Sequence, residues 1–435
     1  MSATCSCQGA PPVRRGRRPE LPRLTVLRGL GALVVLVGHV ALLHPLRDHH
    51  LNVQVDRFLE PLGVAGVSGF FVLSGFVLTW TADRRVGAGA FWRRRLARLY
   101  PVHAATWTIA MLVGAAAGIS GALWKMLPSL ALVNVWVPQL EIFWGPNTPS
   151  WTLSVEAFFY LLFPLLLPIA WRLPARHLHR ALWGVAALIV LWAVLVSQLV
   201  PAGHLVTETG TAYSRIQYFA IVVCPPARLL DFVLGILLAR TVIAGQLPSG
   251  LRPVVYGSLI AGYAAVRWVL PAPFGFVAAM VPAIIIGVLY SAKADLEGTP
   301  SRWAVRPLIW AGEVSFPLYM VHWSVVYGGY HLIGQPTWTP LEALIACLVM
   351  VGISLALAHL LRTRIEIPMY ARFRSATRPA AQLPGPTAAT PAAATTPARP
   401  QHPSPEPQQG VDPHADAAGR DATPTPPGFS ASQRR

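Results

Sequence analysis

The sequence predicts an all-α fold, a polytopic bundle of about ten transmembrane helices. Of its 435 residues, 54% are hydrophobic and only 12% are charged, which is too little charge to cover the surface of a soluble domain. Several apolar stretches also exceed the ~18 residues that a helix needs to cross a bilayer. The composition and the length of the apolar stretches together indicate a multi-pass protein of the cell membrane, embedded in the lipid bilayer.

Ten apolar runs set the predicted spans. They lie at about residues 26–44, 62–81, 99–119, 152–171, 181–200, 227–245, 254–270, 274–292, 307–330 and 341–361. The first run resembles a secretory signal, but His44-Pro45 follows it in place of a small-residue cleavage site. We therefore expect it to be retained as a span.

Arginine and lysine orient this bundle. With the N-terminus in the cytosol, every inner connection is richer in Arg and Lys than its outer neighbours, as the positive-inside rule requires. Both termini are therefore expected in the cytosol, which needs an even number of spans. The net charge of +17 does not indicate nucleic acid as a partner, because the basic residues lie between apolar segments and not along one soluble face.

Three regions follow from the changes in composition. Residues 1–23 are predicted to be a basic cytosolic tail, 24–374 the membrane domain, and 375–435 a cytosolic tail rich in Pro, Ala and Thr. Such a tail buries too little apolar area to offset its ordering entropy, so it is predicted to be disordered. The four cysteines are scattered without metal-ligand spacing, so no metal site is predicted.

The first span carries two ionisable residues on one face. Arg28 and His39 are eleven positions apart, which on a helix is ~16 Å of rise and a return to within ~20° of the starting direction. Arg28 is expected near the cytosolic surface and His39 in the outer half. The plainer interpretation is an arginine that snorkels and a histidine that only packs, but the shared face favours a functional pair.

Three further ionisable groups are predicted at the depth of His39. Glu156 and Asp231 each follow the outer start of a span by about four residues, and His322 lies past the middle of an outward-running span. Because isolated charges in a bilayer are costly, we expect these groups to converge on one polar cavity. A structural network of buried ion pairs is the alternative.

The cytosolic counterpart is the segment FWRRRLARLYP, residues 91–101. Arg95 and Arg98 are three residues apart at the start of a helix, so they share a face and, with Arg28, are predicted to form a clamp for an anion. An ordinary positive-inside loop explains the charge as well, although not its clustering.

These segments resemble the acyltransferase-3 family of integral membrane acyltransferases, over about residues 20–370. The matches, in chain order, are the R-x10-H signature at Arg28 and His39, the small-residue span GFFVLSGFVLT (69–79), the arginine motif RRLARLYP (94–101), the pattern W-S-L-x-x-E-x-x-F-Y at WTLSVEAFFY (151–160) and the pattern Y-x-x-H at Tyr319 and His322. Thr152 stands where the family usually has serine. Five motifs in order on ten spans make the resemblance specific.

The resemblance implies an O-acyltransferase that uses cytosolic acyl-CoA as donor substrate and holds no bound cofactor. The acceptor would be a hydroxyl-bearing sugar, glycolipid or glycosylated metabolite, and acetyl is the commonest acyl group of the family. On this basis Arg28, Arg95 and Arg98 would hold the donor's phosphates. The rise from Arg28 to His39 suits the pantetheine arm.

His39 would then be the general base that takes the proton of the acceptor hydroxyl. Glu156 would orient His39, as a carboxylate does for a catalytic imidazole. The residues expected on the acceptor side, to line it or to stabilise the oxyanion, are Trp151, Asp231, Tyr319 and His322.

Three alternatives stay open from the sequence. The acyl group could pass first to Ser74, Ser154 or His39, although no nucleophile-plus-base spacing favours this. A transporter or flippase would also use intramembrane carboxylates and histidines as a proton relay. A non-catalytic scaffold with the Pro-rich tail as a docking site is the third.

Overall fold

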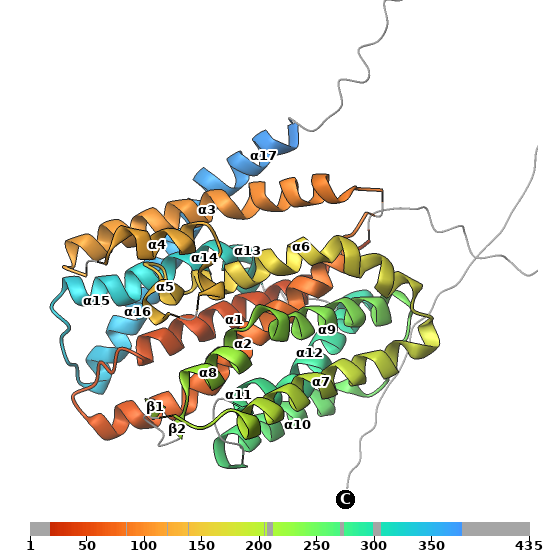
Figure 1. The fold of residues 1–435 in the computed structure, drawn as a ribbon, viewed down its shortest axis with the longest axis horizontal. Coiled ribbons are helices and arrows are strands. Elements are labelled where there is room, and N and C mark those ends of the chain that lie inside the picture. Colours follow the sequence, from red (N-terminus) through yellow and green to blue (C-terminus); the bar gives the residue numbers. More distant parts are fainter. Residues whose placement is uncertain are drawn as a thin grey trace, which may run out of the picture. The chain divides into compact units, whose positions relative to one another are not determined.

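The computed structural model describes residues 18–83, 85–119, 121–137, 139–203, 205–206, 212–269, 274–298 and 306–375. Within these ranges the regular structure is helical, apart from the pairing of the two-residue strands β1 (Leu205–Val206) and β2 (Ala212–Tyr213). The prediction of an all-α helical bundle is confirmed (Figure 1). The predicted disordered tail lies outside the described residues, except for Ser375, and so does most of the predicted N-terminal tail.

Seven helices of the described part are long and apolar enough to cross a membrane. Four are the single helices α1 (Pro22–Ala41), α2 (His49–Trp80), α3 (Ala88–Ala116) and α6 (Ser150–Arg172). The other three combine consecutive helices: η2 (Ala175–His177) with α7 (Leu178–Leu199), α8 (Arg215–Tyr218) through η3 (Phe219–Val223) to α9 (Pro225–Ile243), and α16 (Pro340–Leu361) through η7 (Arg362–Glu366) into α17 (Ile367–Ser375). Each coincides with one of the predicted spans. The protein is therefore a multi-pass membrane protein.

The other three predicted spans fall on helices that are interrupted. They comprise α10 (Leu251–Ala264) with η4 (Ala265–Val269), α11 (Phe274–Ala278) with α12 (Val281–Leu296), and α13 (Arg306–Glu313) followed by α14 (Ser315–Trp323), η6 (Ser324–Gly328) and α15 (Gly329–Leu332). Interruptions of this kind are tolerated in a membrane where other helices cover the freed backbone groups. The count of ten spans and the cytosolic location of the termini stay predictions.

Two helices begin well before the spans that were predicted for them. Helix α2 begins at His49 and not near 62, because the Asp48 side chain caps it by accepting hydrogen bonds from the backbone of His50 and Leu51. Helix α3 begins at Ala88 and not near 99. The first turns of both helices are polar, so the length of the apolar run does not reveal them, although their backbone is helical.

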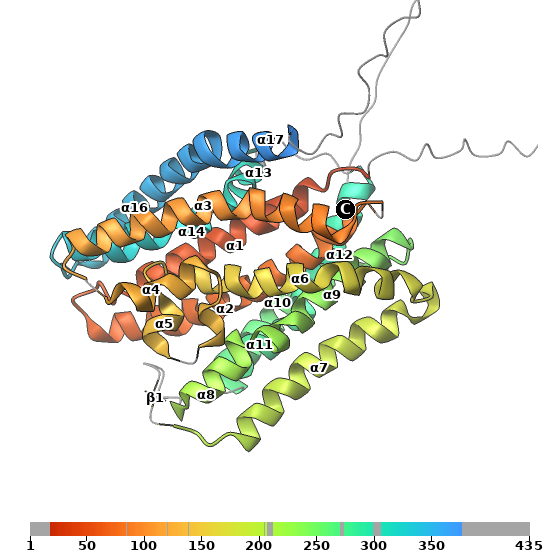
Figure 2. The ribbon, with the colours of Figure 1, turned by 45° about the horizontal axis from the view of Figure 1, so that its top comes forward.

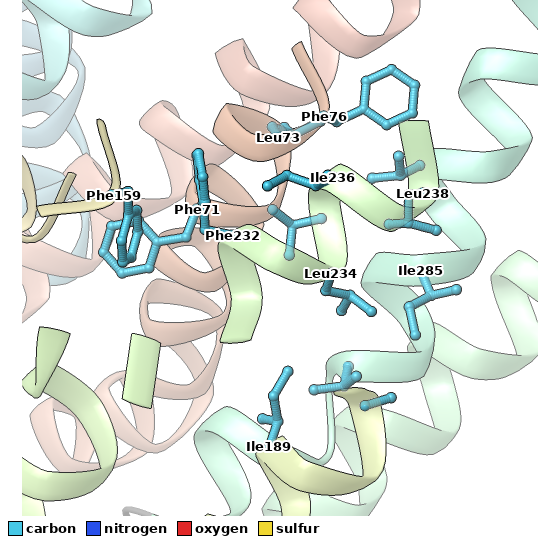
Figure 3. Close-up of a cluster of buried hydrophobic side chains, with 14 of the residues drawn as sticks. Phe71, Leu73, Phe76, Phe159, Ile189, Phe232, Leu234, Ile236, Leu238 and Ile285 are labelled. Carbon is cyan, nitrogen blue, oxygen red and sulfur yellow. The ribbon is translucent and has the colours of Figure 1, made fainter. Parts of the chain in front are cut away.

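Helix α2 crosses α9 (Pro225–Ile243) at two glycines. A Cβ on Gly75 would lie 2.1 Å from the Phe232 carbonyl oxygen, and one on Gly235 would lie 1.9 Å from that of Val72. The two backbones therefore touch, as in other membrane helix pairs built on small residues. The rings of Phe71 and Phe232 flank this crossing, as Figure 3 shows.

Helix α1, which carries Arg28 and His39, is held by neighbours from both halves of the chain. It contacts α2, α13 and α14, and Figures 1 and 2 show it within the bundle beside α2. A Cβ on Gly312 of α13 would lie 1.9 Å from the Thr25 carbonyl oxygen of α1, so these two helices also meet backbone to backbone. The position of α1 is therefore fixed from both sides.

The start of α6 is set by the short helices before it, α4 (Leu123–Leu130), η1 (Asn134–Trp136) and α5 (Leu140–Trp144). Ser154 of α6 donates to the Asn134 side-chain oxygen at 2.6 Å, and the Asn147 amide donates to the Met320 carbonyl of α14 at 2.8 Å. All three polar side chains are buried. These bonds hold the first turns of α6 beside α14.

Candidate active site

His39 and His322 meet inside the bundle. His39 lies in the last turn of α1 and His322 near the end of α14, and His322 Nε2 is 3.0 Å from His39 Nδ1. Their ring centroids are 5.0 Å apart, and the Trp323 ring meets the His39 ring edge-on, with 5.2 Å between the two centroids. The convergence predicted for these two histidines is thus present.

His39 also lines a cavity of about 930 Å³. It lies at the end of the bundle where α1 ends and α2 begins, and its wall includes His39 but not His322. Aromatic rings line much of it, among them Trp144, Tyr218 and Trp323. Its size is within the range that holds small-molecule ligands.

Two of the predicted acceptor-side residues line this cavity, Trp151 and Tyr319. The Trp151 ring is fixed at 5.9 Å from Phe143, and the Tyr319 ring lies 5.7 Å from that of His322. Tyr319 also interacts with the Thr152 side chain of α6. It therefore links the histidine pair to the start of α6.

The cavity also contains polar groups that the sequence did not single out. Glu60 of α2 lines it, and among the described residues its carboxylate makes no hydrogen bond or ion pair. Tyr213, just before α8, lines the same cavity; burial, and secondarily the Glu60 charge, raises the pKa of its phenol. Tyr213 is therefore protonated and able to donate a hydrogen bond.

The three predicted donor arginines gather away from the cavity. Arg28 and Arg95 each interact electrostatically with Arg98, and the Arg95 guanidinium lies 5.7 Å from the Phe91 ring and 5.8 Å from the Tyr160 ring. Like charges stay close only where carboxylates or a ligand compensate them. The cluster therefore has the charge of an anion site.

Glu156 belongs to this arginine cluster and not to His39. Its carboxylate accepts a hydrogen bond from Tyr160 at 3.0 Å, lies in reach of Ser74, and interacts electrostatically with Arg28 and Arg95. The histidine pair has no hydrogen bond to a carboxylate within the described ranges. These interactions assign Glu156 to the end of α1 that carries Arg28 and not to the end that carries His39.

Asp231 has a partner of its own. It pairs with Arg228 at 3.1 Å, three residues earlier on α9, and both side chains are only 2% exposed. Arg228 also donates to Ser68 at 2.6 Å and lines the cavity, whereas Asp231 does not. The arrangement is that of a buried structural ion pair, which was the alternative to a polar cavity. Asp231 contacts Arg228, and Arg228 lines the cavity.

Three residues of the arginine cluster were not predicted as donor-site residues, namely Ser74, Tyr160 and Glu366. Tyr160 follows Glu156 by one helical turn, and that spacing was a readable signal. Glu366 in η7 (Arg362–Glu366) accepts a bond from Arg98 Nε at 3.3 Å and is itself buried. It is the single carboxylate in the sequence RTRIEIP, which follows the last long apolar run.

Comparison with known proteins finds relatives among acyltransferases. Acyltransferase MdmB of Streptomyces mycarofaciens is 34% identical over 84% of this chain and 96% of that protein. Exopolysaccharide production protein ExoZ of Rhizobium meliloti (strain 1021) is 28% identical over 60% of this chain and 76% of that protein. O-acetyltransferase OatA of Staphylococcus aureus is 24% identical over 77% of this chain and 56% of its own length. No solved structure matches.

The fold and these relatives define a multi-pass membrane acyltransferase. The chain belongs to the acyltransferase-3 family, since the family's acyltransferase-domain model matches residues 21–359. The resemblance drawn from the sequence motifs is thereby confirmed. Residues 376–435 lie outside both that match and the described part of the chain.

Proposed function

We propose that this protein transfers an acyl group from cytosolic acyl-CoA to a hydroxyl of a carbohydrate, a glycolipid or a glycosylated metabolite. One observation carries the proposal. Arg28 and His39 share one helix, yet Arg28 belongs to a cluster of arginines and His39 lines a cavity of about 930 Å³. A donor with an anionic end and a reactive end ~16 Å away fits this arrangement.

The donor site is assigned to Arg28, Arg95 and Arg98, which would bind the phosphates of acyl-CoA by charge-assisted hydrogen bonds. Glu156, Tyr160 and Ser74 form the far side of this cluster. We therefore assign Glu156 to balancing and positioning the arginines, in place of the orienting role toward His39 that the sequence suggested.

The acceptor site is assigned to the cavity. His39 takes the proton of the acceptor hydroxyl as that oxygen attacks the thioester carbonyl. The carbonyl carbon gains a C–O bond, the C–S bond breaks, and the CoA thiolate leaves and receives a proton. Tyr319 is close enough to the histidine pair to donate to the developing oxyanion.

Two relatives support a carbohydrate acceptor and an acetyl group. The name of ExoZ refers to exopolysaccharide production, and OatA is named an O-acetyltransferase. Aromatic rings, which line this cavity, present flat apolar faces suited to sugar rings.

The test compares envelope glycans, lipids and secreted metabolites by mass spectrometry in four otherwise identical strains. They carry the wild-type gene, His39→Ala, His179→Ala or no gene, with membrane levels of the proteins matched. His179 is exposed at the start of α7, so its substitution controls for the loss of a histidine as such. An acyl-sized mass that appears only with wild type and with His179→Ala supports the proposal and identifies the acceptor. Acylation with His39→Ala equal to that with wild type rejects His39 as the base, and transport would be tested next. Acylation that is the same without the gene rejects acyl transfer by this protein.

A further inference from the structure

The hydrogen bonds of His322 fix where its proton lies. Its Nδ1 is 3.2 Å from the Leu318 carbonyl oxygen, one turn earlier on α14, and its Nε2 is 3.0 Å from His39 Nδ1. A carbonyl oxygen only accepts, so Nδ1 of His322 carries a hydrogen. A neutral imidazole has one N–H, which leaves Nε2 of His322 as an acceptor.

Both rings are neutral in this arrangement. His322 is 1% exposed, and within the described residues neither ring is hydrogen-bonded to a carboxylate that could balance a positive charge. A buried charge without a partner is costly, so the uncharged pair is favoured. An acceptor on His322 then requires a donor on His39, and His39 Nδ1 must carry the proton.

We infer that His322 is a positioning residue that holds the proton of His39 on Nδ1 and leaves His39 Nε2 free as the base toward the cavity. The inference rests on the proposed function for its purpose, but its geometry does not depend on acyl transfer. In a serine-histidine-aspartate triad a carboxylate fixes the tautomer of the base. Here a second imidazole, fixed by a backbone carbonyl, takes that place.

The tautomer can be observed directly. The full-length protein, labelled with ¹⁵N-histidine and held in nanodiscs, would be recorded by NMR at pH ~8.5, about two units above the ordinary histidine pKa of ~6.5. The chain has 13 histidines, so His39 is assigned by the signal that His39→Gln removes. We expect His39 with a proton on Nδ1 and none on Nε2.

His103 supplies an internal control in the same spectrum. It is fully buried on α3, its Nε2 lies 3.1 Å from the Ser129 carbonyl oxygen, and its Nδ1 has no hydrogen-bond partner among the residues that the structure describes. The same reasoning gives His103 the opposite tautomer, with the proton on Nε2. An unchanged His103 signal also shows that a variant has kept its fold.

Two substitutions separate positioning from packing. His322→Gln keeps a side-chain oxygen that accepts a hydrogen bond, whereas His322→Leu keeps bulk but no acceptor. We expect His322→Leu to lose the preference for Nδ1–H on His39 and His322→Gln to retain it. Where transfer is measurable, kcat should fall about 10²-fold or more for His322→Leu and by less than about tenfold for His322→Gln.

A proton on Nε2 of His39 in the wild type, or a His39 tautomer unchanged by His322→Leu, overturns the inference. A wild-type protein that transfers no acyl group would reject the proposed function alone, because the tautomer is measured without turnover.

Discussion

Arg98 and Glu366 join two helices that are far apart in the sequence. Arg98 Nε of α3 donates to Glu366 Oε1 at 3.3 Å across 268 positions. Glu366 also interacts electrostatically with Arg28, and α17 (Ile367–Ser375) continues from it along α3, as Figure 1 shows. The end of the last long helix is therefore tied to the arginine cluster.

The Glu366 carboxylate is expected to stabilise this end of the protein. Glu366→Gln removes the charge that compensates the arginines, and because Arg98 is 44% exposed the expected loss is modest, about 1 kcal/mol. The measurement is the melting temperature of the purified protein. Glu342→Gln is the matched control, since the Arg47–Glu342 pair is about half exposed and glutamine also serves at this capping position. Equal shifts for both variants would contradict the structural role of Glu366.

The donor site is tested on two neighbouring arginines. Arg95 is held between aromatic rings within the cluster, whereas Arg94 is exposed. Removing one charge-assisted contact costs about 1.5–3 kcal/mol, so Arg95→Gln should raise the Kd for acyl-CoA by roughly ten- to a hundredfold. Calorimetric titration of acyl-CoA into nanodiscs measures this, with Arg94→Gln expected to bind as wild type. A donor affinity unaffected by Arg95→Gln would remove Arg95 from the site.

The acceptor site is tested by filling the cavity. Gly63 of α2 lines it, and a Cβ there would meet no atom of the described residues within 4 Å, so Gly63→Leu can project into the cavity. We expect acyl transfer to fall by at least about tenfold, because the leucine side chain would occupy part of the space that the acceptor needs. A tenfold change corresponds to ~1.4 kcal/mol. Acyl-CoA binding should be unchanged. Gly69→Leu, on the same helix but outside the cavity wall, is the control. Full activity of Gly63→Leu would mean that the acceptor binds elsewhere.

The crossing of α2 and α9 should be a sensitive packing point. Gly235→Ala puts a methyl group 1.9 Å from the Val72 carbonyl oxygen, so the two backbones must separate. Overpacking typically costs about 1–3 kcal/mol, which should lower the melting temperature by several degrees. Gly184→Ala on α7, where a Cβ meets nothing within 4 Å, should be neutral or slightly stabilising. A Gly235→Ala protein as stable as wild type would disprove the close approach.

The sequence predicted the parts of the site that local spacing determines. The shared face of Arg28 and His39 follows from their spacing of eleven residues on a helix, and the shared face of Arg95 and Arg98 follows from their spacing of three. The place of Glu156 beside the arginines did not follow, because it depends on how α6 packs against the rest of the bundle. Bonds such as Ser154 to Asn134, which set this position, have no signature in hydropathy.

The common depth of His39 and His322 was predicted from the sequence, but their direct contact was not. His39 and His322 are 283 positions apart, and only the packing of α1 on α14 brings their rings together. Asp231 shows the opposite case, because its partner Arg228 lies three residues away on the same helix face. That ion pair was readable from the spacing, and it explains Asp231 without a substrate.

His39 is proposed as the base for acyl transfer from acyl-CoA. The most direct measurement uses purified wild-type and His39→Ala proteins in nanodiscs, with isotopically labelled acetyl-CoA and an envelope extract as the source of acceptor. We expect labelled acetyl esters with wild type, a rate about 10²–10⁴-fold lower with His39→Ala, and equal acyl-CoA binding by both. A His39→Ala protein that transfers the label at nearly the wild-type rate would show that His39 is not the base.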